Sequence, residues 1–102
     1  MTMLNIVNKS PFERNGLSSC LRLAQRGAAV LLIEDGVYAA LENTEKSDLI
    51  KNRLTDLSFY VLSSDLDIRG LSDSKIINGV LKINYGDFVD LVEKYDAAHS
   101  WL

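Results

Sequence analysis

The run Ala28-Ala29-Val30-Leu31-Leu32-Ile33 is followed directly by Glu34-Asp35-Gly36, and this stretch decides the fold. Six consecutive apolar residues leave no polar face, which is typical of a strand buried on both sides. Strands of that kind belong to parallel sheets whose two faces are covered by helices. Gly36 permits a sharp turn where such a strand would end. The stretch therefore predicts a buried strand of a parallel α/β sheet.

Strands and helices alternate on both sides of this stretch. Residues 3–7, 59–62 and 80–84 are apolar or rich in β-forming side chains, and we predict that they are strands. Each connection is long enough for a helix, as parallel strands require. We predict one small, doubly wound, three-layer α/β domain over residues 1–102, with a mostly parallel sheet of four to five strands.

The first helix is predicted from a local start signal. Ser10 can act as the N-cap, Pro11 suits the first helical position, and Glu13 completes a capping box. We expect this helix to end near Arg26, with Gly27 as its C-terminal cap. Further helical segments are predicted over residues 37–41, 47–56, 63–70 and 87–95, and no element is predicted for the tail after them.

Composition and charge exclude several classes of function. The 102 residues are 47% hydrophobic and 25% charged, which is ordinary for a globular chain. Eleven Lys and Arg residues stand against fourteen carboxylates, so no basic surface for direct nucleic-acid binding is expected. No apolar run approaches the roughly 20 residues that cross a bilayer, and no secretory signal is recognised. A single cysteine requires no oxidising compartment, so a cytoplasmic location is expected.

Few side chains can support catalysis. The chain has one Cys and one His, no paired spacing typical of metal ligands, and no glycine-rich phosphate loop after the first strand. No cofactor and no metal are therefore expected. Cys20 is the candidate nucleophile, as a thiol that accepts a sulfane sulfur. It lies in mid-helix on the apolar face with Leu17 and Leu21, where core packing is the simpler interpretation.

Two further places are candidate binding or interface positions. Asp35 and Gly36 follow the most buried strand, at the edge where open α/β sheets form sites, although a tight turn alone explains them equally well. Trp101 and Leu102 are large apolar residues at the end of the sequence, and we expect them to dock on this domain or on a neighbouring subunit. His99 in the same tail is expected to be a solvated surface residue.

Several short motifs, taken in order, resemble the DsrH/TusB family. The similar segments are Asn8-Lys9-Ser10-Pro11-Phe12-Glu13-Arg14-Asn15, Leu31-Leu32-Ile33-Glu34-Asp35-Gly36-Val37-Tyr38-Ala39-Ala40, Asp65-Leu66 with Arg69-Gly70-Leu71, Tyr85 with Asp87-Phe88-Val89-Asp90-Leu91, and the terminal Trp101-Leu102. They are collinear and cover essentially the whole chain, although none is a catalytic fingerprint. Cys20 also matches a cysteine of DsrH-type members that TusB-type members can lack.

The resemblance implies one subunit of a larger assembly rather than an enzyme by itself. DsrH and TusB are small α/β subunits of heterohexamers that also contain DsrE/TusD-like and DsrF/TusC-like chains. Such complexes relay persulfide sulfur to a DsrC/TusE-type carrier protein. The cysteine that carries most of this sulfur lies on the DsrE/TusD-like subunit, which is a different chain. Cys20 would then be at most an auxiliary acceptor, and its presence favours the DsrH branch, whose pathway is sulfur oxidation.

Three alternatives stay open at this point. The chain could be a TusB-type subunit, whose complex supplies sulfur for the 2-thiouridine of tRNA wobble positions. Cys20 could act as an independent persulfide carrier, which predicts a thiol that alkylates quickly near neutral pH. A small-ligand or nucleotide domain using the Asp35-Gly36 edge is supported by the predicted topology alone.

Overall fold

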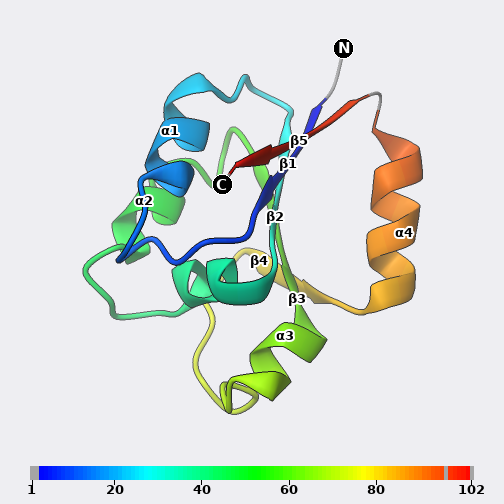
Figure 1. Ribbon diagram of the computed structural model, residues 1–102. Helices are drawn as coiled ribbons and strands as arrows, with labels where there is room; N and C mark the ends of the chain where they lie inside the picture. The colour runs from blue at the N-terminus through cyan, green and yellow to red at the C-terminus, as the bar shows by residue number, and fades with distance from the viewer. Residues whose placement is uncertain (1–2, 96, 102) are drawn as a thin grey trace.

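The computed structural model describes residues 3–95 and 97–101, and it contains one five-stranded sheet (Figure 1). The strands are β1 (Met3–Val7), β2 (Ala29–Leu32), β3 (Ser58–Leu62), β4 (Val80–Ile83) and β5 (Ala97–Trp101). Their spatial order is β4-β3-β2-β1-β5, and every neighbouring pair is parallel. The predicted parallel α/β class is confirmed, with β2 in the middle of the sheet.

Helices cover both faces of this sheet and complete three layers. They are α1 (Gly16–Leu23), the 3₁₀ helix η1 (Glu34–Ala40), α2 (Ser47–Lys51), α3 (Ser63–Ile68) and α4 (Tyr85–Lys94). Figure 1 shows α1 and α2 on one side of the sheet and α4 alone on the other. Among the described residues, no helix is long and apolar enough to cross a membrane.

β2 contributes to two hydrophobic cores, one on each face. Val30 and Leu32 belong to the core under α1 and α2, whereas Ala29 and Leu31 belong to the core under α4. All four side chains are fully buried, because a central strand of a three-layer fold has helices over both faces. This double burial is the physical reason for the uninterrupted apolar run in the sequence.

The predicted start and end of the first helix are wrong. Instead of capping a helix, Ser10 closes a turn: its Oγ accepts from the Phe12 N–H and its carbonyl oxygen from the Arg14 N–H at 3.0 Å. α1 begins only at Gly16 and ends at Leu23. Gly27, with a φ of 93°, instead sits in the turn before β2, where its N–H donates to Asp56 O. The capping signal at Ser10 is thus satisfied by a local turn, and Gly27 is held by a hydrogen bond to a distant segment.

The tail, for which no element was predicted, forms β5 beside β1. Its residues do not alternate between apolar and polar, and His99 and Ser100 are exposed. The strand exists because its backbone pairs with β1, from Met3 opposite Ala97 to Val7 opposite Trp101. Tertiary pairing of this kind leaves little trace in the sequence.

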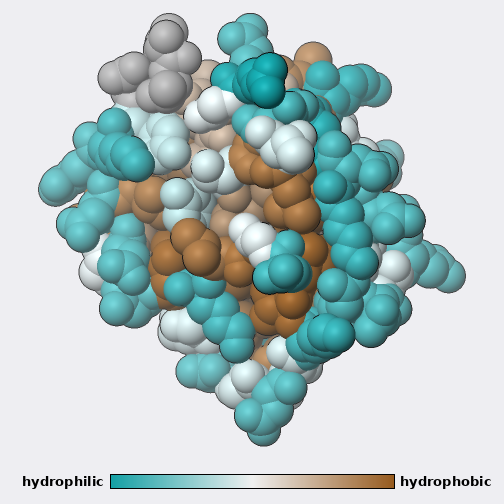
Figure 2. Space-filling view, turned by 180° about the vertical axis from the view of Figure 1, so that it is seen from behind, coloured by the Kyte–Doolittle hydropathy of each residue, from teal (hydrophilic) through white to brown (hydrophobic). Residues whose placement is uncertain are grey.

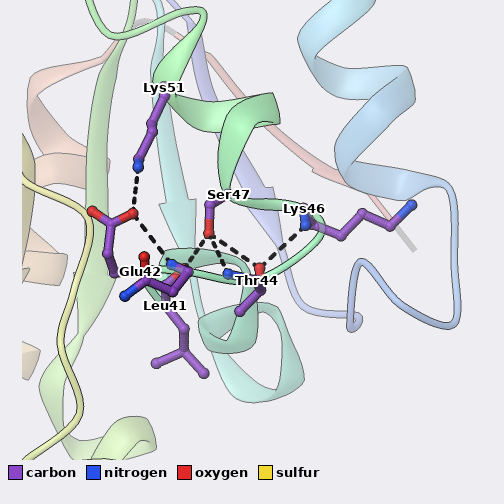
Figure 3. Close-up of polar contacts among 7 residues, drawn as sticks. Leu41, Glu42, Thr44, Lys46, Ser47 and Lys51 are labelled. Carbon is purple, nitrogen blue, oxygen red and sulfur yellow. Dashed lines mark hydrogen bonds and ion pairs between the residues drawn. The ribbon is translucent and has the colours of Figure 1, made fainter.

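Hydrogen bonds around Ser47 order the loop that leads into α2 (Figure 3). Ser47 Oγ donates to the Leu41 carbonyl oxygen at 2.8 Å and accepts from the Thr44 N–H at 2.9 Å. On the same loop Glu42 pairs with Lys51, and the hydrogen bond from Lys51 is the main reason why the pKa of Glu42 is lowered. The buried hydroxyl thus fixes how the chain leaves η1 and enters α2.

Candidate functional site

Polar contacts link the segments that follow β2 and β3 at the carboxyl edge of the sheet. η1 begins with Glu34, whose φ of 50° is left-handed, and its N–H donates to Asp65 Oδ2 at 2.7 Å. Asp35 forms an ion pair with Arg69, with 2.9 Å between Oδ1 and Nε. Arg69 also donates to the Asp65 carbonyl oxygen at 3.1 Å. Asp35 is therefore held at this edge, and the Asp65 carboxylate accepts from the first residue of η1.

Gly36 lets η1 pass directly over the end of β1. A Cβ built on Gly36 would lie 2.1 Å from the carbonyl oxygen of Val7, far inside any allowed contact. The requirement for glycine here is close backbone approach rather than a left-handed conformation. Gly36 is thus a packing position that sets where Asp35 stands.

A polar crevice of about 340 Å³ opens beside this edge. It is lined by Ser10, Phe12, Glu13, Asp35 and Tyr38, from the segments after β1 and β2. These side chains offer two carboxylates, two hydroxyls and two aromatic rings, without a thiol or imidazole. Within the described ranges, no group of three or more His, Cys, Asp or Glu could hold a metal ion. The crevice suits contact with a polar surface better than catalysis.

Cys20 lies in the core rather than in the crevice. Its side chain is 0% exposed and packs in the cluster under α1 with Leu17 and Val30. Burial raises the pKa of the Cys20 thiol to about 12, and the charge of Arg53 offsets this only in part. A thiol is a nucleophile as its thiolate, so this environment holds Cys20 in its unreactive form.

A second, mostly apolar pocket of about 410 Å³ lies between β5 and the end of α1. Met3, Asn5, His99 and Trp101 line it from the strands, and residues between Leu23 and Ala28 line it from the other side. Asn5 is buried in mid-strand, donates to Ala29 O at 3.1 Å and accepts from Trp101 Nε1 at 3.0 Å. The His99 ring packs edge-on against Trp101, with centroids 4.7 Å apart. Trp101 therefore docks on its own sheet.

We predict that Trp101→Phe lowers the free energy of unfolding by about 1–3 kcal/mol, because the buried Asn5 Oδ1 loses its donor while an aromatic ring is kept. Urea denaturation followed by circular dichroism measures the change. The double variant Asn5→Ala/Trp101→Phe should lose less than the sum of the single variants, since both partners are then gone. Strict additivity would contradict the role given to this hydrogen bond.

The structure distributes the candidate residues over separate places. Asp35 lines the carboxyl-edge crevice and Gly36 supports it, Trp101 lines the apolar pocket, and Cys20 lines neither. Leu102 lies outside the described residues.

Sequence reasoning missed the roles of Arg69 and Asn5. Arg69 pairs with a carboxylate 34 positions away, a separation that no local pattern reports. Asn5 did carry a signal, since it is a polar residue inside an otherwise apolar strand, and such residues need buried partners.

Comparison with known proteins then identifies the family. The family model described as DsrH like protein matches residues 9–98. The chain belongs to the DsrH-like family. Its DsrH/TusB membership, expected from the motifs, is confirmed, and the family is one of sulfur-relay subunits.

Relatives support the DsrH assignment over nearly the full length. The protein named TusB from Shigella flexneri is 33% identical over 99 residues, covering 97% of this chain and 100% of the relative. TusB proteins from Escherichia coli strains, such as O81 strain ED1a, match with the same identity and coverage.

Two solved structures are similar to this DsrH-like chain. The YchN protein from E. coli has a TM-score of 0.77 at 18% identity, over 98% of this chain and 99% of that one, which concerns the fold alone. The protein Tm0979 from Thermotoga maritima has a TM-score of 0.61 at 29% identity, over 90% of this chain and 92% of that one.

Proposed function

We propose that this chain is a partner-docking subunit of a cytoplasmic, heterohexameric sulfurtransferase, assembled with DsrE/TusD-like and DsrF/TusC-like subunits. The complex passes persulfide sulfur to a DsrC/TusE-type carrier. The observation that carries the proposal is the burial of Cys20, because it is the chain's single cysteine. A sulfur-relay subunit without an accessible thiol acts by positioning the thiol of another subunit.

Exposed apolar surface supports docking to other subunits. Seen from behind, the molecule shows brown apolar surface down its middle between polar flanks (Figure 2). β4 and α4 contribute the exposed large side chains Leu81, Tyr85, Val89 and Val92. The α4 residues are spaced four and three apart, so they form one stripe on the helix in addition to its buried face. Contiguous apolar surface of this kind marks interaction sites in soluble proteins.

The destination of the sulfur is a second proposal. Cys20 favours sulfur oxidation by its resemblance to DsrH-type members. The relatives at 33% identity carry the name TusB, which favours delivery toward tRNA 2-thiouridine. Because Cys20 is explained by core packing, we place tRNA thiolation first and sulfur oxidation second. The tRNA of a strain deleted for this chain should then lack 2-thiouridine, and normal thiolation would leave sulfur oxidation as the destination.

Co-expression with the two partner subunits of the same organism tests the assembly. The purified complex is incubated with a sulfane-sulfur donor, and the intact mass of each chain is measured. We expect the added sulfur on the DsrE/TusD-like chain, with no gain on this one. A Cys20→Ser complex should accept the same amount of sulfur. Recovery of this chain alone would refute the subunit role, and a gain that Cys20→Ser abolishes would make Cys20 a relay site.

A further inference from the structure

The two edges of the sheet are protected differently. Edge strands usually carry Lys, Pro or a bulge, which prevent pairing with a foreign strand. β4 carries the exposed Lys82. β5 is Ala-Ala-His-Ser-Trp, without Lys, Pro or a carboxylate, and it pairs on one side with β1 (Figure 1). Within the described residues, the outer side of β5 is thus an open edge that a further strand could join.

The apolar pocket adjoins this open edge. His99 and Trp101 of β5 line it, and they alternate with the exposed Ala98 and Ser100 on the opposite face. A strand paired with the outer side of β5 would place every second side chain on the face that holds the pocket. A single extended segment could therefore pair its backbone with β5 and place an apolar side chain in the pocket.

The charge at the rim of the pocket indicates which charged group a bound segment would have. Among the described residues that line the pocket, Arg26 is the one that carries a formal charge at neutral pH. Its side chain is 83% exposed, and its ion pair with Asp56 is long, with 3.9 Å between Nε and Oδ1. An exposed guanidinium at the rim of an apolar pocket fits a carboxylate on the incoming chain. A second copy paired edge to edge would instead present the same cation.

We propose that β5 and the adjoining pocket bind an extended segment of a partner subunit. This segment adds a strand to the sheet, places an apolar side chain in the pocket and sets a carboxylate beside Arg26. The proposal rests on the proposed function, since it names one docking surface of that subunit.

Hydrogen exchange on the co-expressed complex and on the isolated chain provides the test. We expect the amides of residues 97–101 that point away from β1 to exchange at least tenfold more slowly in the complex. Equal exchange in the two samples overturns the proposal. The proposal is also overturned if the same amides are protected in the isolated chain and the protection increases with its concentration. The occupant of the edge is then a second copy. If no complex forms, the subunit role itself fails, and that result is distinct from a complex with unprotected β5.

Matched variants distinguish the role of the β5 surface from the general effect of a changed surface charge. Ser100→Lys places a cation on the open edge, and Ser18→Lys makes the same change on an exposed position of α1. We expect at least a tenfold lower yield of complex with Ser100→Lys and an unchanged yield with Ser18→Lys. Arg26→Glu should weaken assembly, whereas Arg22→Glu, outside the pocket lining, should not. Wild-type yields with both Ser100→Lys and Arg26→Glu overturn the proposal.

Discussion

The thiol of Cys20 is expected to react with iodoacetamide about a thousandfold more slowly in the native chain than in the denatured chain at neutral pH. Burial raises its pKa from 9.0 to about 12, and each pH unit is a tenfold change in thiolate. Steric protection by the core adds to this factor, since the side chain has no exposed surface. Mass spectrometry of timed, quenched samples measures both rates.

The pH profile distinguishes a raised pKa from simple inaccessibility. The native rate should rise about tenfold per pH unit between pH 7 and pH 9.5 without a plateau, whereas the denatured rate should level off above about pH 9. Cys20→Ser gives the background of the assay. Stoichiometric labelling of the native chain within minutes at pH 7 would instead restore Cys20 as an independent persulfide carrier.

Gly36→Ala should reduce the free energy of unfolding by about 3 kcal/mol, because the new methyl group would overlap the Val7 carbonyl oxygen. Relief requires the backbone of η1 to move away from β1. That movement also displaces Asp35 and lengthens its 2.9 Å contact with Arg69. Chemical denaturation measures the loss, and the chain can fail to fold at 37 °C if its stability is ordinary.

Gly27→Ala is the matched control for this substitution. Gly27 has a left-handed φ of 93°, but a Cβ there meets nothing within 4 Å. Its replacement should cost about 1–2 kcal/mol from backbone strain alone. If Gly36→Ala lowers the free energy of unfolding no more than Gly27→Ala does, then η1 accommodates the new methyl group without strain.

The fold could be predicted because its central strand is unusual. Four consecutive fully buried residues in β2 allow few arrangements other than a sheet covered on both faces. β5 could not be predicted in the same way, because its exposed residues pack little and it depends on pairing with β1. The start of α1 was wrong for a related reason. The signal at Ser10 to Glu13 is local, and it is satisfied equally well by a turn.

The sequence predicted where the candidate site lies better than it predicted which residues form it. Asp35 was found because carboxyl ends of parallel strands are where sites form, and the crevice lies there. The side chain that holds it belongs to Arg69, the residue after α3 and 34 positions later, and this pairing follows from the three-dimensional fold. The simpler interpretation of Cys20 as a core residue agrees with its burial, because helical periodicity reports the buried face directly.

The hydrogen bond between Asn5 and Trp101 joins residues 96 positions apart, and this has a consequence during synthesis. In a ribosome-bound fragment without residues 97–101, Asn5 Oδ1 has no Trp101 donor and the outer side of β1 has no partner strand. Such a fragment opens more readily, and proteases act on opened chains. Quality-control proteases would therefore remove prematurely terminated copies before they could occupy a place in a larger assembly.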